Sequence, residues 1–226
     1  MPNFYVLESG DGLLFGDKWS YAEMLPPINL GESEKCPICG AAVSDQKWLP
    51  PHRVKLSSDE KEKWGDLLWG VGFRLIVTKR FIDIYKKEKL KGIIKIHPPV
   101  HVIKFRTGAL GHSAPFLPTY HLVDIPWGGA NQDDRASGVT FENAAQLKCT
   151  HCRQGVTWRK QERVEIEKGS WNGADIFIPR GAPVPFMISE RFKKVAEDYG
   201  LTNGWLIPAE NYAYDERRPG LWYIHT

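Results

Sequence analysis

Two cysteine pairs carry the clearest chemistry in this chain. Cys36 and Cys39 have the C-x-x-C spacing, as do Cys149 and Cys152, and the chain has no other cysteine. One C-x-x-C turn presents two sulfurs to a single ion, and four thiolates in two such turns match the ligand set of a closed structural zinc site. We therefore expect all four cysteines to bind one structural Zn²⁺, joining segments that lie 113 positions apart (149 − 36).

The second turn departs from the first in one respect. Gly40 follows the first pair, and a glycine there permits a positive φ that turns backbone amides toward the sulfurs. Arg153 occupies the same place after the second pair, which predicts a weaker turn. Lys35, Lys148 and Arg153 flank the pairs, and we expect them to offset part of the negative charge of four thiolates on Zn²⁺.

Two other interpretations of the cysteines stay open. A Cys-Pro-x-Cys turn at the start of a helix has a low thiol pKa and suits disulfide exchange. The chain after Cys39 soon reaches Pro50 and Pro51, which leaves no room for a long helix and counts against this interpretation. Alternatively, all four thiols are small core side chains, since free cysteine is often buried.

The elements that position the cysteines follow a pattern that occurs twice. Each pair is followed by an apolar run, at residues 75–77 and 186–188, and then by Ser/Thr-x-Arg-Phe. Thr78 aligns with Ser189 and Arg80 with Arg191, both at an offset of 111 (189 − 78; 191 − 80). Thr78 and Ser189 are typical helix N-caps, and apolar residues follow them at helical spacing. We predict an α+β fold of two pseudo-repeated strand–helix–strand halves joined by the four-cysteine zinc site.

No residue pattern in the chain builds an active site, so we do not expect an enzyme. For Arg80 and Arg191 we expect a structural role, pairing with a carboxylate or with strand carbonyls; a catalytic role is the alternative. Trp127 and Trp171 lie among glycines and are either core residues or anchors for a partner.

Length and composition indicate one domain with a substantial core. The chain has 226 residues, of which 42% are hydrophobic and 12% aromatic. We predict a single domain over residues 1–226, with two related halves at about 1–106 and 141–226 and a long connection at 107–140. The connection is rich in Gly, Pro, Ser and Asp.

Charge and hydropathy limit the classes of partner. The formal net charge is +3, from 30 basic and 27 acidic residues, which is too balanced for nucleic acid to be the default partner. No apolar stretch has the length of a signal peptide or a membrane span. We therefore expect a cytoplasmic protein with no membrane contact, in a compartment where reducing conditions favour metal-bound thiolates over disulfides.

The order of these motifs resembles the bacterial double-CXXCG proteins. The likeness runs from Phe-Tyr-Val at residues 4–6 through Cys-Pro-Ile-Cys-Gly at 36–40 to Asp-Leu-Leu-Trp at 66–69 and the run at 72–81. It continues with the second cysteine pair, Ala-Asp-Ile-Phe at 174–177 and Phe-Met-Ile-Ser-Glu-Arg-Phe at 186–192. It covers most of the chain and is least clear at residues 95–145.

Members of that family are immunity proteins, which bind and neutralise a cognate polymorphic toxin. The resemblance implies that this chain is a non-catalytic protein whose partner is a cognate protein toxin. We expect the interface within residues 107–140, because long exposed loops carry recognition. The alternative is a zinc-ribbon-type nucleic-acid-binding or regulatory protein, which steeply salt-dependent binding to DNA or RNA would identify.

Overall fold

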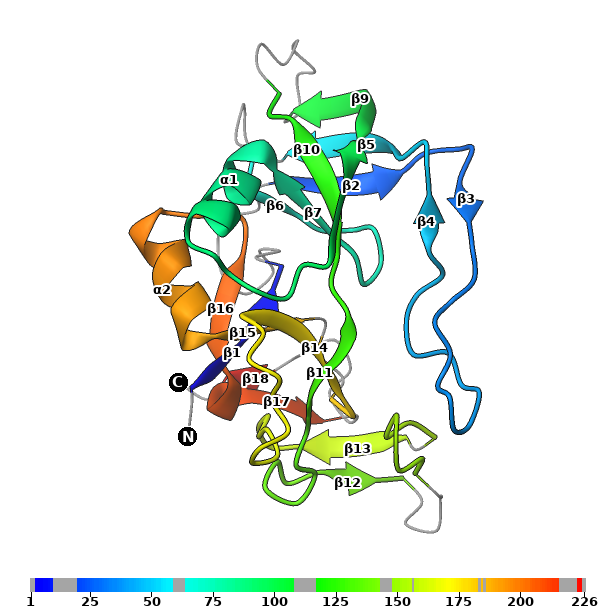
Figure 1. Ribbon diagram of the computed structural model, residues 1–226, viewed down its shortest axis with the longest axis vertical. Helices are drawn as coiled ribbons and strands as arrows, with labels where there is room; N and C mark the ends of the chain where they lie inside the picture. Colours follow the sequence, from blue (N-terminus) through cyan, green and yellow to red (C-terminus); the bar gives the residue numbers. More distant parts are fainter. Residues whose placement is uncertain are drawn as a thin grey trace.

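The computed structural model describes residues 3–9, 20–58, 64–107, 117–142, 148–155, 157–182, 184, 186–215 and 223–224. Strands make up 41% of this described structure and helical segments 12%, with two α-helices and several small sheets (Figure 1). The predicted α+β fold of two strand–helix–strand halves is therefore wrong, and the protein is mostly β. The prediction extended two short helical segments to whole halves, whereas strands are the main regular structure of the described residues.

One sheet of five strands joins the first described strand to strands from the second half of the chain. Its order is β11–β14–β15–β1–β16, with β11 (Trp127–Asn131), β14 (Ile176–Arg180), β15 (Phe186–Ser189), β1 (Phe4–Glu8) and β16 (Trp205–Pro208). β1 pairs antiparallel with both β15 and β16. The N-terminal strand therefore lies between two strands from the C-terminal part of the chain, and its Val6 is fully buried.

Two further sheets share one cluster of buried apolar side chains. A four-stranded sheet has the order β6–β7–β10–β8, with β6 (Leu67–Leu68), β7 (Leu75–Thr78), β10 (Tyr120–Asp124) and β8 (Lys95–Pro99). A three-stranded sheet has the order β2–β5–β9, with β2 (Ser20–Met24), β5 (Arg53–Ser58) and β9 (His101–Thr107). Leu56 of β5 packs in one buried cluster with Ile76 of β7 and Leu122 of β10, so the two sheets face each other across this core.

Smaller elements complete the described structure. They are β3 (Asn29–Leu30) with β4 (Trp48–Leu49), the set β12 (Thr140–Phe141), β13 (Trp158–Gln161), β17 (Tyr212–Asp215) and β18 (Tyr223–Ile224), and a 3₁₀ turn at Ala209–Asn211. Residues 108–116 of the expected connection at 107–140 lie outside the described residues. The rest of that segment contains β10 and β11, so it is not one continuous loop.

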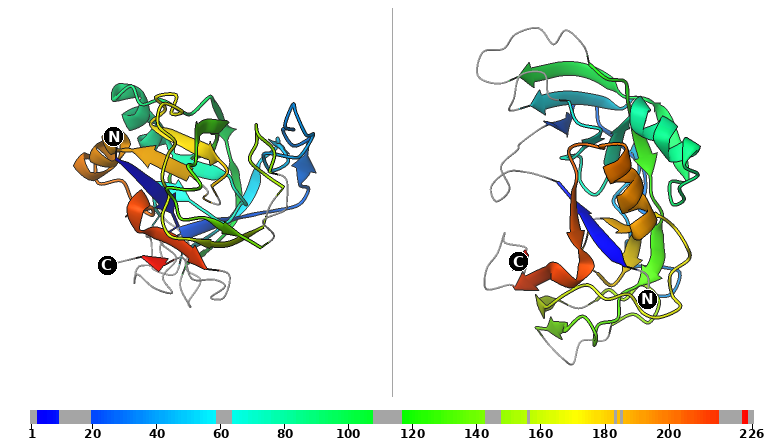
Figure 2. Two further views of the ribbon diagram at one scale, coloured as in Figure 1. Left: turned by 90° about the horizontal axis from the view of Figure 1, so that it is seen from below. Right: turned by 90° about the vertical axis from the view of Figure 1, so that its left-hand side faces the viewer.

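Two α-helices, α1 (Lys79–Lys87) and α2 (Glu190–Asp198), lie side by side on one side of the molecule (Figures 1 and 2). Their predicted N-caps are confirmed: the side chain of Thr78 accepts from Phe81 N at 3.1 Å, and that of Ser189 accepts from Phe192 N at 3.2 Å. The rings of Phe81 and Phe192 meet between the helices, with centroids 6.1 Å apart. Within the described residues, no helix has the length and apolar character needed to cross a membrane.

A buried carboxylate fixes the start of each helix. Thr78 Oγ1 donates to Asp66 Oδ1 at 2.8 Å, and Arg80 forms an ion pair with Asp66 Oδ2. In the same way Ser189 Oγ donates to Asp175 Oδ1 at 2.8 Å, and Arg191 pairs with Asp175 Oδ2 at 3.2 Å. The predicted pairing of both arginines with a carboxylate is therefore confirmed.

Each arginine also reaches the end of the other helix. Arg80 donates to the carbonyl of Tyr199, the C-cap of α2, and Arg191 donates to the carbonyl of Glu88, the C-cap of α1. Unpaired carbonyls at a helix C-terminus carry partial negative charge, so a cation there is stabilising. The start of each helix is thus connected to the end of its neighbour.

Candidate metal centre

The first cysteine pair lies near the tip of a long hairpin, which we call the knuckle hairpin (residues 29–49). It extends beside the rest of the molecule toward β12 and β13 (Figure 1). Its two arms are joined by hydrogen bonds from Gly31 N to Lys47 O and from Val43 N to Glu34 O, both 2.8 Å. The second pair lies in the connection between β12 and β13. The hairpin therefore carries one half of the site across the molecule to the other half.

The two turns have the same backbone hydrogen bonds. Cys36 N donates to Ala41 O, five positions on, at 2.8 Å, and Cys149 N donates to Gln154 O, also five positions on, at 3.0 Å. In the first turn Gly40 N donates to Cys36 O at 2.9 Å, and in the second Arg153 N donates to Cys149 O at 2.8 Å. The two halves of the site are therefore locally equivalent.

The four thiols gather at one point. Cys36 Sγ lies 3.9 Å from Cys149 Sγ, and Cys39 Sγ lies 3.5 Å from Cys152 Sγ. All four sulfurs lie within 4.8 Å of one another. A tetrahedral ion with four metal–sulfur bonds of about 2.3 Å places its sulfurs about 3.8 Å apart. The arrangement therefore fits a four-thiolate metal site, and the residues chosen from the sequence are the ones that meet.

The backbone of each turn favours a thiolate at its first cysteine. Burial raises the pKa of Cys36, but N–H groups of Cys39 and Ile38 donate to its sulfur and lower the net pKa below the usual value. The N–H groups of Cys152 and His151 lower the pKa of Cys149 to about 6. Burial raises the pKa of Cys152 to about 12, so that thiol needs a nearby positive ion to ionise.

Arg153 has a left-handed backbone conformation, which glycine usually adopts. Its φ is 60°, close to the 73° of Gly40 at the equivalent place in the first turn. The arginine side chain donates to the carbonyl of Gln132 and pairs with Glu167. These contacts offset the strain of a left-handed non-glycine residue, so the replacement does not prevent the second turn from forming.

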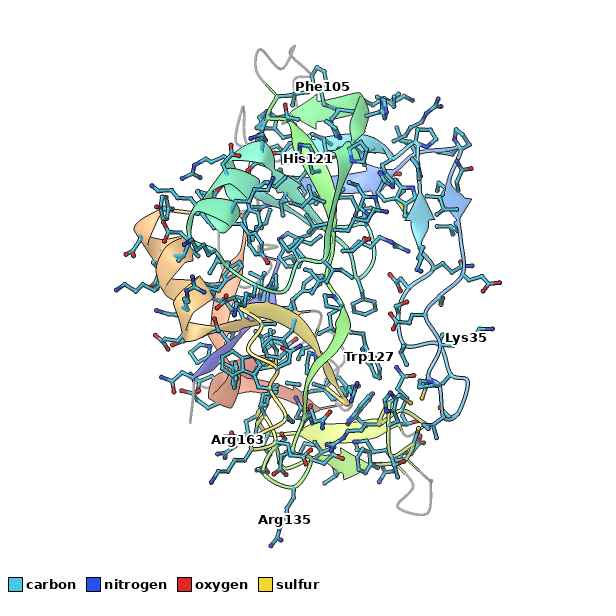
Figure 3. The ribbon with its side chains drawn as sticks, viewed as in Figure 1. Lys35, Phe105, His121, Trp127, Arg135 and Arg163 are labelled. Carbon is cyan, nitrogen blue, oxygen red and sulfur yellow. The ribbon has the colours of Figure 1, made fainter. Side chains whose placement is uncertain are left out.

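Two of the three flanking cations are paired with carboxylates. Lys148 pairs with Asp134 and Arg153 with Glu167, so each lysine or arginine charge is largely matched by a carboxylate. Lys35 is exposed on the knuckle hairpin (Figure 3). The partial offset of the thiolate charge by these three residues stays a prediction, and backbone N–H groups stabilise the thiolates of Cys36 and Cys149 in addition.

Substitutions of Arg153 should separate the energetic cost of backbone strain from the stabilisation by the side-chain contacts. Arg153→Ala removes both contacts and keeps a left-handed residue with a Cβ, so we expect the free energy of unfolding to fall by about 2 kcal/mol. Arg153→Gly also loses the contacts but relieves the strain, and should be more stable than Arg153→Ala by about 1 kcal/mol. Urea unfolding measures both differences.

Gly40→Ala is the matched control for that pair. No atom lies within 4 Å of the added Cβ, so the change introduces strain at φ 73° and no clash. A loss of about 1 kcal/mol is expected. Equal stability of Arg153→Ala and Arg153→Gly would contradict the left-handed conformation of this turn.

The two tryptophans considered as partner anchors are both engaged within the protein. Trp127 packs beside the cysteine cluster, with Arg180 over its ring at 4.8 Å and the ring of His151 at 6.0 Å. Trp171 packs against Phe4 and donates from Nε1 to a backbone carbonyl at 2.9 Å. Their positions agree with a packing role.

Other titratable groups lie apart from this centre. His97 Nε2 contacts Asp124 Oδ2 at 2.9 Å, and the ring of His52 lies 5.0 Å from that of His97. Burial lowers the pKa of His52. His121 lies in the other half of the molecule from Lys35, which directly precedes Cys36 in the chain (Figure 3). Sequence reasoning missed the pairing of His97 with Asp124, because 27 positions separate the two residues and no motif connects them.

Sequence reasoning also missed the buried carboxylates Asp66 and Asp175. A signal was present, since each precedes the Ser/Thr-x-Arg-Phe motif, by 12 positions to Thr78 and by 14 to Ser189. A carboxylate was one of the two partners expected for each arginine, and these two acids precede their motifs by nearly the same number of positions.

Fold and site together define a mostly β protein with a candidate four-thiolate metal centre built by two equivalent turns. A scan against protein-family models matches no family, and a search of curated proteins finds no matching protein.

Proposed function

We propose that the four cysteines hold a structural Zn²⁺ ion. Four thiolates in tetrahedral spacing are the donor set that zinc takes in closed structural sites. All four positions are filled by protein sulfur, which leaves no open position for water or substrate, so the ion would serve to join the knuckle hairpin to the β12–β13 connection. The binding energy of such an ion contributes directly to folding.

We further propose that the protein is a non-catalytic, cytoplasmic immunity protein that binds and neutralises a cognate protein toxin. The observation that carries this proposal is the meeting of both C-x-x-C turns in one centre. Those turns are two of the motifs whose order along the chain carries the resemblance to the double-CXXCG proteins. A metal-fixed hairpin also supports a binding role, because a preorganised surface loses less freedom when a partner binds.

The saturation of the buried carboxylates is consistent with a role other than acid–base catalysis. Asp66 accepts from Thr78, from Arg80 and from both N and Oγ1 of Thr202, the last two at 3.2 and 3.1 Å. Asp175 accepts from Ser189, Arg191 and the N–H of Lys91. Carboxylates held in this way stabilise the fold and have few free lone pairs for a substrate.

Co-expression with the toxin encoded beside this chain tests the proposed function. We expect this chain to restore growth to cells that make the toxin, and the two proteins to elute as a one-to-one complex. The same cells carrying Cys39→Ser in this chain should lose most of the protection, because the variant lacks the metal that fixes the hairpin. Absence of both rescue and complex with the unaltered chain would exclude the immunity function.

A further inference from the structure

One stretch of the chain that contains β9 has a net positive charge because it has no acidic residue. Residues 89–123 include no aspartate or glutamate. The same stretch holds five basic residues, Lys89, Lys91, Lys95, Lys104 and Arg106. Since the whole chain has a formal net charge of +3, the remainder sums to −2 (3 − 5). The charge asymmetry is therefore local in the sequence, and two of the five basic residues, Lys104 and Arg106, belong to β9.

β9 is an edge strand with exposed apolar side chains. It stands last in the sheet order β2–β5–β9, and among the described residues no strand pairs with its second edge (Figure 1). Ile103 is 54% exposed and Phe105 is 41% exposed, and Figure 3 shows Phe105 at the end of the molecule opposite Arg135 and Arg163. An open edge offers backbone N–H and C=O groups to an added strand.

The solvent-facing side of the same sheet is basic. Residues opposite each other in neighbouring strands share a face, and the register places Arg53 beside His101 and Lys55 beside Lys104. Glu23 pairs with Lys55 at 2.7 Å. No carboxylate of the described residues pairs with Lys104, which is exposed. Lys104 thus keeps its positive charge available on the edge strand, and the partly exposed Arg53 lies on the neighbouring β5.

We infer that β9 is the contact strand for an acidic, extended segment of the partner protein, which adds to the edge of the β2–β5–β9 sheet. Backbone hydrogen bonds would supply affinity, while Ile103 and Phe105 would take apolar side chains and Lys104 an acidic one. A protein fits this surface better than a nucleic acid for two reasons. The exposed apolar residues Ile103 and Phe105 precede and follow Lys104 in β9. The acidic residue Glu23 lies on the same face of the sheet as Lys104. The inference rests on the proposed function for the identity of the partner.

Titration of the neighbour-encoded toxin with three forms of this chain tests the inference. Lys104→Glu reverses a charge on β9 and should weaken the complex by about 30-fold, with a smaller effect at high salt. Lys168→Glu makes the same charge change at an exposed lysine outside β9 and should change the affinity by less than about twofold. Matching melting temperatures of the three forms would show that each is folded.

Hydrogen exchange in the complex tests strand addition separately from charge. We expect the amides of β9 to become protected when the toxin binds, and the exposed amides of α2 to stay unchanged. If the toxin binds the unaltered chain and Lys104→Glu equally and β9 gains no protection, β9 is excluded as the contact strand. The proposed immunity function is not affected by that result.

Two other outcomes are also decisive. If the unaltered chain does not bind the toxin at all, the proposed function fails and this interface fails with it. If Lys104→Glu leaves the toxin affinity unchanged but abolishes salt-dependent binding of a DNA duplex or a single-stranded RNA, the surface serves nucleic acid and the inference of an acidic protein segment is overturned.

Discussion

Cys39→Ser is expected to remove the bound metal and to destabilise the protein as strongly as Cys152→Ser does. Cys39 is exposed and Cys152 is fully buried, so packing alone would make the two changes very different. A shared ion makes them equivalent, because either change removes one of four ligands and structural metal binding is coupled to folding. We expect a loss of about 3 kcal/mol or more for each, which lowers the melting temperature by about 6–12 °C.

Metal analysis and thermal unfolding, with and without chelator, measure this prediction. The unaltered protein should contain one zinc per chain and lose stability in chelator, whereas the two serine variants should contain little zinc and respond little to chelator. If the thiols are only small core side chains, Cys152→Ser would be destabilised and Cys39→Ser would be almost silent. That asymmetry, together with unaltered protein free of metal, would exclude the zinc centre.

The four cysteines of the candidate metal centre could be predicted from the sequence, because the signal of each pair is local and rests on general coordination chemistry. A C-x-x-C turn has one compact geometry, and two such turns need only one ion to bring them together. The expected weakness at Arg153 did not follow from the residue type alone. Whether an arginine is held in a left-handed conformation depends on distant partners, here Gln132 and Glu167, which the local sequence does not identify.

The fold class could not be predicted because it depends on strand pairing across long distances. The N-caps Thr78 and Ser189 were correct, since capping requires only a hydroxyl and the next turn. The pairing of β1 with β15 and β16 joins residues near opposite ends of the chain, and no local pattern encodes it. Five of the eighteen described strands are also only two residues long, too short for alternation to be visible.

The contacts between the two helices predict a second large loss of stability, from the substitution Asp66→Ala. This carboxylate is buried, and the change Asp66→Ala leaves Thr78, Arg80 and Thr202 without their acceptor. We expect the free energy of unfolding to fall by about 3 kcal/mol, since the hydroxyl groups lose a charged acceptor while the half-exposed Arg80 can turn partly to water. Urea unfolding measures the loss.

Asp83→Ala provides the matched control on the same helix. Asp83 pairs with Lys79 at the i,i+4 spacing, and both side chains are more than half exposed. Exposed pairs of this kind contribute about 0.3–0.5 kcal/mol, so the change should be nearly silent. A loss at Asp66 no larger than that at Asp83 would contradict the role of the buried carboxylate.

Hydrogen exchange tells whether Asp66 stabilises its own helix or both helices. Asp66 precedes α1 in sequence, but it accepts from the N–H of Thr202, and its partner Arg80 donates to the C-cap carbonyl of α2. In Asp66→Ala we therefore expect faster exchange at Thr202 and in the last turn of α2 as well as in the first turn of α1. If exchange rises only in α1, the arginine connects nothing beyond its own helix, and the two helices would be stabilised independently.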